Sequence, residues 1–196
     1  MLKVGLTGEA GAGKSYVSKI LREEFGIPVI DSDNVTRELM QPGQIVFNNV
    51  VDTFGEEYLD DEGHINRTKL ARLVFNNEEM LLKLNNITHP ATIDEIKSRI
   101  EKYESEGYKM VVIESAIALD SAYDDFCDEF WYVYADEASR RERLKENRGY
   151  SDEKIDSIIS SQRDEKFFRE HCCKVIENTF GATKETIVKQ LKTFIH

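Results

Sequence analysis

Residues 2–15 read LKVGLTGEAGAGKS, in which an apolar run leads directly into the pattern G-x-x-x-x-G-K-S. The run Leu2–Leu6 predicts a short buried strand, and apolar residues at helical spacing follow the motif as far as Gly26. The motif is typical of loops whose glycines let backbone N–H groups surround a phosphate. The strand, loop and helix together predict that the chain binds a nucleoside triphosphate.

Individual residues of the motif have distinct expected roles. Gly8, Gly11 and Gly13 carry no Cβ atom and let the backbone curl around the phosphates. Lys14 supplies a mobile positive charge for the β- and γ-phosphates, and the Ser15 hydroxyl is placed to bind Mg²⁺. The alternative is a glycine-rich turn that only resembles the pattern, and the strand and helix on either side argue against it.

The composition indicates the class of protein and excludes several partners. The chain has 196 residues, 40% hydrophobic and 32% charged, which suits one α/β domain with room for inserted subdomains. Its formal net charge of −11 argues against a nucleic-acid surface. No apolar stretch approaches the roughly 18 residues needed to cross a membrane, and we expect no signal peptide before the first strand. We expect a cytoplasmic protein with reduced thiols at its three cysteines and no obligate protein partner.

Five apolar runs predict strands. They cover Leu2–Leu6, Ile27–Ile30, Lys109–Glu114, Phe130–Ala135 and Lys174–Ile176. Helical patterns separate them, so we expect a three-layer α/β fold with a mostly parallel sheet and ligands beyond the carboxyl ends of its strands. The pattern from 33 to 107 is helical throughout, which predicts a helical insertion.

Acidic side chains follow two of the predicted strands. Asp31 and Asp33 come directly after the second strand, and Glu114 ends the third. Carboxylates at this edge can hold Mg²⁺ or accept the proton of an attacking hydroxyl. The alternative for the aspartates is a helix N-cap before Asn34, and the alternative for Glu114 is an ordinary loop residue or cap. We favour a functional role for Asp33.

A cluster of cations stands out in this acidic chain. Five of them fall within nine residues: Arg140, Arg141, Arg143, Lys145 and Arg148. Guanidinium groups stabilise the charge that spreads over the γ-phosphate oxygens during phosphoryl transfer, when a closing lid brings them in. The alternative is a solvated helix whose glutamates compensate the charge.

One histidine lies in a distinctive context. His89 precedes Pro90 inside the helical region. It could hydrogen-bond a ribose or phosphate oxygen of the acceptor, or it could be a buried structural histidine at a helix break. The residue type alone does not separate the two interpretations.

With these features assembled, the chain resembles the dephospho-coenzyme A kinase family over nearly its whole length. The most specific features are the Asp31-x-Asp33 pair, the His89-Pro90 pair and the Gly63-x-Ile65-x-Arg67 stretch, because many kinases share the phosphate loop. Further matches follow in the family's order: Pro42-Gly43, Phe54-Gly55, Val74-Phe75, Arg143-Leu144, Gln162 and Val175-Ile176-x-Asn178.

The chain departs from the family pattern at several positions. Glu9 stands where the family usually has a second glycine, and Tyr16 stands where threonine is common. We expect neither to make an essential side-chain contact, because backbone amides surround the phosphates. Asn147 replaces a frequent lid arginine, and the adjacent Arg148 could substitute for it.

The resemblance implies ATP-dependent phosphorylation of the ribose 3′-hydroxyl of dephospho-coenzyme A, the last step of coenzyme A synthesis. It implies a three-layer P-loop NTPase fold with a mostly parallel five-stranded sheet, formed by residues 1–32, 108–135 and 173–196. It also implies a helical acceptor-binding insertion over 33–107 and a helical lid over 136–172. The expected partners are two small molecules, ATP with Mg²⁺ and dephospho-coenzyme A.

The residue patterns above and the positions matched to the family together give the expected site residues. They are Asp33, Lys14, Arg140 and Arg143 for catalysis; Gly8, Gly11, Ala12, Gly13, Lys14, Ser15 and Tyr16 for the ATP phosphates; Asp33, Arg67, His89 and Arg148 for the acceptor; and Ser15 and Glu114 for Mg²⁺. Asp33 is expected to orient and deprotonate the acceptor hydroxyl, while Lys14 and the arginines neutralise charge in the transition state.

Two alternatives remain open from the sequence. The first is a kinase of another small acceptor on the same core, such as a nucleoside monophosphate, shikimate or gluconate. The second is a nucleotide-dependent regulatory switch. The Asp-x-Asp pair and the arginine cluster argue against a switch, and the sequence lacks a guanine-reading Asn-Lys-x-Asp motif.

Overall fold

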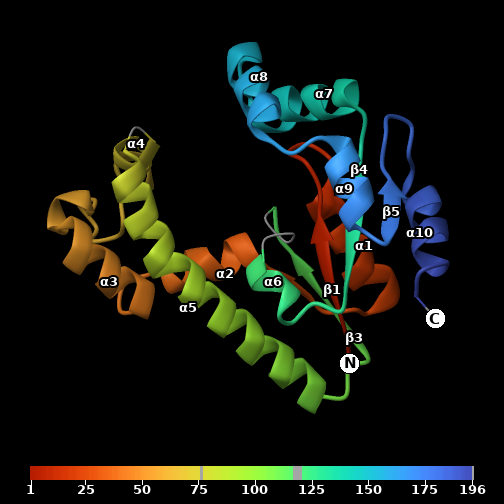
Figure 1. The fold of residues 1–196 in the computed structure, drawn as a ribbon, viewed down its shortest axis with the longest axis horizontal. Helices are drawn as coiled ribbons and strands as arrows, with labels where there is room; N and C mark the ends of the chain where they lie inside the picture. The colour runs from red at the N-terminus through yellow and green to blue at the C-terminus, as the bar shows by residue number, and fades with distance from the viewer. Residues whose placement is uncertain (76, 117–120, 196) are drawn as a thin grey trace. The chain divides into compact units, whose positions relative to one another are not determined.

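A computed structural model describes residues 1–75, 77–116 and 121–195 (Figure 1). The chain divides into two compact units. The first contains Met1–Ile30 and Tyr103–His196, and the second contains Asp31–Lys102. We describe each unit by itself.

A five-stranded sheet forms the centre of the first unit. Its strands are β1 (Leu2–Thr7), β2 (Val29–Asp31), β3 (Met110–Glu114), β4 (Glu129–Tyr134) and β5 (Lys174–Glu177). The strand order is β2-β3-β1-β4-β5, and β1 pairs in parallel with both β3 and β4, as does β4 with β5. The expected parallel α/β sheet is therefore confirmed. The second strand begins two residues later than predicted. Ile27 packs in the core before the strand starts, and hydrogen bonding to the sheet begins at Pro28, whose carbonyl accepts from the Val112 amide.

Helices surround this sheet. They are α1 (Lys14–Phe25), α6 (Ser121–Asp124), α7 (Glu137–Arg148), α8 (Asp152–Ser161), α9 (Glu165–His171) and α10 (Lys184–Lys192). Alternation along β4 explains the layers, because successive side chains of a strand point to opposite faces. Trp131 and Val133 pack in one core with residues of α1 and α10, whereas Tyr132 stacks on Phe168 of α9. The sheet thus lies between two helical layers.

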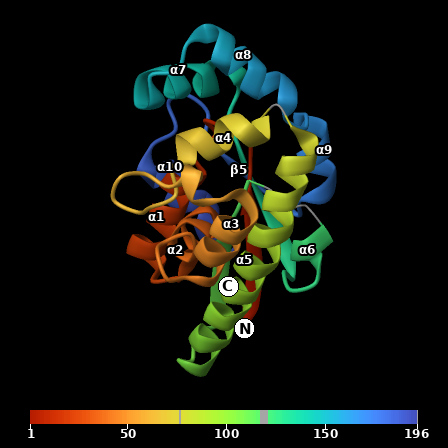
Figure 2. The ribbon, with the colours of Figure 1, turned by 90° about the vertical axis from the view of Figure 1, so that its left-hand side faces the viewer.

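The helix ends follow simple capping rules. Side chains of Asp136, Ser151, Asp164 and Thr183 accept hydrogen bonds from backbone amides at the starts of α7, α8, α9 and α10. Gly26 and Gly149 end α1 and α7 in the left-handed conformation. Helices α7 and α8 lie side by side, joined by ion pairs such as Arg141–Asp156 (Figure 2).

The second unit is helical. It contains α2 (Ser32–Leu39), α3 (Ile45–Phe54), the 3₁₀ turn η1 (Glu56–Tyr58), α4 (Arg67–Phe75) and most of α5 (Glu78–Ser105). A small core binds these helices together: Val46, Val50, Phe54, Ile65 and Leu70. Within the described residues, none of the helices combines the length and apolar character that crossing a lipid bilayer requires.

The structure decides between the two interpretations of His89 in the second unit. Helix α5 continues through Pro90, and the side chain of His89 is exposed. The interpretation of His89 as a buried histidine at a helix break is therefore wrong. A proline removes one backbone hydrogen bond, and a helix of 28 residues retains the others.

Candidate active site

Gly11 and Gly13 show why the loop between β1 and α1 needs glycine. Gly11 and Gly13 have φ angles of +81° and +94°, which side chains with a Cβ atom rarely adopt. A Cβ atom on Gly11 would lie 2.7 Å from the carbonyl oxygen of Arg140, and one on Gly13 would collide with the amide group of Asn178. The loop is thus closely packed on its outer side as well as bent.

Lys14 begins α1 and folds back over the loop. Its Nζ donates to the carbonyl oxygens of Gly8 at 2.6 Å and Glu9 at 3.4 Å. The start of a helix carries a partial positive charge from its unpaired N–H groups, which favours bound anions. The loop therefore combines a helix N-terminus with an ammonium group beside it, which suits polyphosphate.

Ser15 and Glu114 come together next to this loop. The Ser15 hydroxyl donates to Oε1 of Glu114 at 2.7 Å. The Glu114 side chain ends β3 and is buried, and its Oε2 has no hydrogen-bond partner among the described residues. A hydroxyl and a carboxylate are the oxygen ligands that Mg²⁺ prefers. A buried carboxylate oxygen without a partner fits a metal ion or its bound water, so the two residues expected to hold Mg²⁺ fit that role.

Arg143 and Asn178 hold the backbone of the loop. Nη1 of Arg143 donates to the carbonyl oxygens of Gly11 at 3.2 Å and Ala12 at 3.1 Å, and Nη2 donates to the carbonyl oxygen of Asn178 at 2.6 Å. The Asn178 amide in turn donates to the Ala12 carbonyl at 2.7 Å. These contacts satisfy carbonyl groups of the loop and hold its backbone in place. Sequence reasoning expected Arg143 at the phosphates, and did not anticipate its contacts with the loop backbone.

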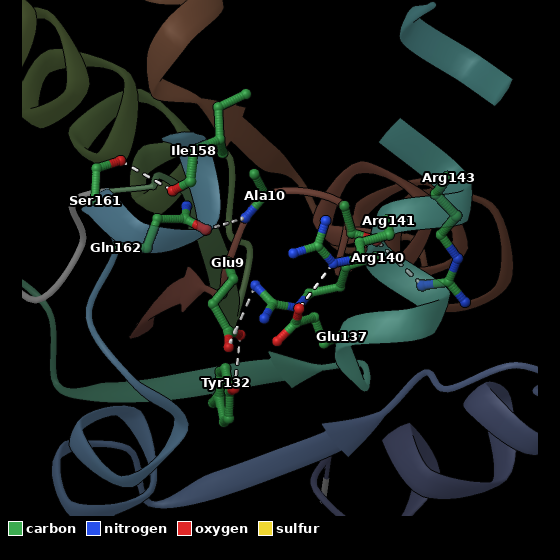
Figure 3. Close-up of polar contacts among 12 residues, drawn as sticks. Glu9, Ala10, Tyr132, Glu137, Arg140, Arg141, Arg143, Ile158, Ser161 and Gln162 are labelled. Atoms are coloured by element: carbon green, nitrogen blue, oxygen red, sulfur yellow. Dashed lines mark hydrogen bonds and ion pairs between the residues drawn. The ribbon is translucent and has the colours of Figure 1, made fainter. Parts of the chain in front are cut away.

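Glu9 makes buried side-chain contacts that the sequence did not suggest (Figure 3). Only 3% of this residue is exposed. Its Oε2 accepts a 2.6 Å hydrogen bond from the Tyr132 hydroxyl, and its Oε1 lies 3.7 Å from Nη1 of Arg140. Burial and the hydrogen bond to Glu9 raise the pKa of Tyr132, which keeps the hydroxyl protonated. From the sequence we expected no essential side-chain contact from Glu9, and the structure instead shows its carboxylate buried between Tyr132 and Arg140.

Gln162, to which the sequence assigned no role, also contacts the loop. Its Oε1 accepts a 3.2 Å hydrogen bond from the Ala10 amide, as Figure 3 shows. The residue follows α8 and reaches the loop from the segment expected to act as a lid. Its position among the family matches was the one signal that could have identified it.

The expected acceptor-side residues lie mostly in the helical unit. Asp33 is exposed in the first turn of α2. Asp31 is the N-cap of that helix, since its Oδ1 accepts from the Asn34 amide at 3.0 Å. Capping therefore accounts for Asp31 and leaves Asp33 without a capping role. Arg67, at the start of α4, and His89, in α5, are both exposed.

Two remaining predicted residues lie at the surface of the first unit. Arg148 ends α7 and is exposed, without a hydrogen bond or ion pair to another described residue. Tyr16 lies in the first turn of α1 with 41% of its surface exposed. Both side chains are accessible to a ligand.

The fold and loop define a class. A parallel sheet with a G-x-x-x-x-G-K-S loop between its central strand and the following helix is the P-loop nucleotide-binding fold, here in the three-layer form found in small-molecule kinases. The family model for dephospho-CoA kinase matches residues 2–184. The chain belongs to the dephospho-CoA kinase family.

Individual relatives agree with this assignment. A dephospho-CoA kinase of Carboxydothermus hydrogenoformans is 38% identical over 81% of this chain and 77% of its own. One of Shouchella clausii is 33% identical over 97% of this chain and 95% of its own. A crystal structure of a Thermus thermophilus protein superposes with a TM-score of 0.83 at 26% identity, covering 99% of this chain and 96% of that one. Membership of a kinase family makes ATP the expected phosphate donor.

Proposed function

We propose that the protein transfers the γ-phosphoryl group of ATP to the ribose 3′-hydroxyl of dephospho-coenzyme A, giving coenzyme A and ADP. The observation that carries this proposal is the phosphate loop of a dephospho-CoA kinase family member, with Lys14 and the Ser15–Glu114 pair beside it. The test is incubation with ATP, Mg²⁺ and dephospho-coenzyme A, followed by mass spectrometry for a product that has gained one phosphate. Nucleoside monophosphates, shikimate and gluconate serve as control acceptors, and phosphorylation of one of these instead would contradict the proposal.

Asp33 is the proposed general base. Support comes from its position in the first turn of α2, two residues after β2, and from its exposed carboxylate. A carboxylate in this role orients the acceptor hydroxyl and accepts its proton as the oxygen attacks the γ-phosphorus. Arg67 and His89 are proposed to bind the acceptor, and their exposure supports this role.

Ser15 and Glu114 are the residues proposed to hold Mg²⁺. Bound there, the ion would neutralise charge on the β- and γ-phosphates. The hydroxyl and carboxylate at 2.7 Å, together with the unpartnered Oε2 of Glu114, support this assignment. Mg²⁺ commonly takes only one or two protein ligands and completes its shell with phosphates and water.

Lys14, Arg143 and Arg148 each have a different proposed role. Lys14 is proposed to move from the loop carbonyls to the phosphates and to stabilise the charge that develops there. Arg143 is proposed to keep the loop in shape close to the transferred group, and Arg148 is the exposed cation available to a closing lid. The acceptor-binding insertion over 33–107 and the lid over 136–172 are part of the same proposal.

A cytoplasmic location is also proposed. All three cysteines are unpaired thiols, as expected in a reducing compartment. Fractionation of cells that produce the protein, with immunodetection in the cytosolic fraction, tests this location. Recovery with the membrane or extracellular fraction would contradict it.

A further inference from the structure

We propose that Arg140 supports phosphate binding through Glu9, as a positioning residue that neutralises a carboxylate carried by the phosphate loop itself. The proposal rests on the proposed ATP site, and it changes the role expected for Arg140 from that of a lid cation that touches the phosphates.

Glu9 carries a buried negative charge, which requires a positively charged partner. The residue follows Gly8 in the loop and is 3% exposed, so its carboxylate is shielded from water beside the place where a triphosphate would bind. A buried carboxylate is costly unless it is paired, and an uncompensated one would also repel the phosphates. The Tyr132 hydroxyl donates a hydrogen bond at 2.6 Å but brings no charge. The charge is balanced by Arg140, whose Nη1 lies 3.7 Å from Oε1 of Glu9.

The backbone fixes Arg140 in this position. Helix α7 approaches the loop so closely that a Cβ atom on Gly11 would lie 2.7 Å from the Arg140 carbonyl oxygen and 3.0 Å from its Cα. Only 8% of Arg140 is exposed, and the neighbouring Ser139 is buried as well. A residue whose main chain packs against the loop while its side chain pairs with Glu9 is part of the support of the loop.

Arg141 provides the comparison within the same helix. Its guanidinium forms solvent-accessible ion pairs with Glu137 at 2.7 Å, drawn in Figure 3, and with Asp156 at 2.6 Å. Adjacent arginines on one helix thus have different surroundings, and of the two it is Arg140 that pairs with a loop carboxylate. Exchanging either arginine removes one positive charge from α7, which makes Arg141 a matched control.

A competing explanation is direct contact between Arg140 and a phosphate. Nε of Arg140 is buried without a hydrogen-bond partner among the described residues, so one donor remains that a phosphate oxygen could use. The two explanations differ in what removal of the Glu9 charge does. Neutralisation predicts that Arg140 becomes dispensable once Glu9 is uncharged, whereas direct contact predicts that it remains necessary.

The test is a double-mutant cycle on ATP affinity, measured by calorimetry with Mg²⁺ and without an acceptor. We expect Arg140→Met to weaken ATP binding by roughly tenfold or more, because charged neighbours in contact couple strongly. Glu9→Gln keeps the hydrogen-bond acceptor for Tyr132 and should bind ATP at least as tightly as the wild type, because the remaining guanidinium adds positive potential. The double variant should recover to within about threefold of Glu9→Gln, and Arg141→Met should match the wild type.

Two results would overturn the proposal. A double variant that binds as weakly as Arg140→Met would show that Arg140 touches the phosphates directly. Wild-type affinity in Arg140→Met would show that Glu9 needs no neutralising partner. Arg140→Lys guards against misfolding, since it keeps the charge and should retain most of the affinity where Arg140→Met loses it. Because the assay contains no acceptor, failure to phosphorylate dephospho-coenzyme A would refute the proposed function without affecting this test.

Discussion

The Ser15 hydroxyl, one residue into α1, donates a 2.7 Å hydrogen bond to Oε1 of Glu114 at the end of β3. The register of the sheet explains this contact, because Leu6 of β1 lies opposite Glu114 and the phosphate loop starts two residues further on. The carboxyl ends of parallel strands meet at one edge of a sheet, where ligands of α/β proteins bind. Two residues 99 positions apart in the chain are thereby brought to one site.

Glu114→Gln should weaken the response to Mg²⁺ more than nucleotide binding itself. Glutamine keeps an oxygen that can accept from Ser15 but removes the negative charge that attracts the cation. We expect the Mg²⁺ concentration for half-maximal activity to rise by roughly 10–100-fold, the range seen when residues around a metal are changed. Activity titrated with Mg²⁺ measures this, with ADP affinity in chelator as the control. An unchanged Mg²⁺ requirement would remove Glu114 from the metal site.

Asp33→Asn should lower turnover by at least roughly 10²-fold while largely keeping ATP affinity, since general base catalysis contributes 10²–10⁴-fold. Steady-state kinetics and calorimetry give the two quantities. Asp31→Asn is the matched control, because asparagine caps a helix as well as aspartate does and should preserve α2. Near-normal turnover in Asp33→Asn would remove the assignment as base.

Lys14→Ala should reduce turnover by roughly 10²–10³-fold, as expected when a group that stabilises transition-state charge is lost. Binding of ATP should weaken as well, because the ammonium group is proposed to contact the β- and γ-phosphates. The circular dichroism spectrum should not change, since the Lys14 side chain lies over the loop rather than in the core. A variant that retains its rate would contradict the role of the phosphate loop.

Much of the fold could be predicted because it depends on local patterns. Short apolar runs separated by helical periodicity predicted the strands, and the motif predicted the loop with its glycines at positive φ. At Pro90 the sequence left two interpretations of His89 open, and the continuous helix excludes the one that required a helix break. Proline weakens a helix locally, and contacts along the rest of its length decide whether it persists.

The supporting contacts of the loop could not be predicted in the same way. Glu9 and Tyr132 are 123 positions apart, and no spacing rule connects them. The same holds for Arg140 and Arg143, which the sequence identified as a cation cluster but whose partners depend on how closely α7 packs on the loop. Residue type predicted the charge of these side chains, and only the three-dimensional arrangement identified which atoms they contact.

Arg143→Ala should destabilise the first unit as well as weaken ATP binding. The guanidinium donates to three backbone carbonyls, and hydrogen bonds from a charged donor contribute about 1.5–3 kcal/mol each without being additive. A loss of about 2 kcal/mol of unfolding free energy corresponds to a melting temperature lower by about 4–8 °C in a chain of this size. Thermal denaturation measures it. Arg141→Ala, which removes only exposed ion pairs that water and salt screen, is the control, and equal shifts in both variants would contradict the role of Arg143.

Two thiols should make stability fall at alkaline pH. Burial raises the pKa of Cys127 and of Cys172 from 9.0 to about 12 in the folded protein, with Asp128 adding to the effect at Cys127. Above pH 9 the unfolded chain loses these protons while the folded chain keeps them, so unfolding becomes easier as the pH rises towards 12. Below pH 9 both thiols are protonated in the folded and the unfolded chain, so they cause no loss of folding free energy there.

The slope of this effect is about 1.4 kcal/mol per pH unit for each thiol that titrates only in the unfolded state. Urea unfolding of the wild type between pH 8 and pH 10.5 should show this loss beyond that caused by other groups. In Cys127→Ala/Cys172→Ala the free energy of unfolding should fall less steeply over the same range, whatever its absolute value. Parallel curves for the two proteins would show that the thiols titrate alike in the folded and unfolded states, which would contradict their burial as neutral groups.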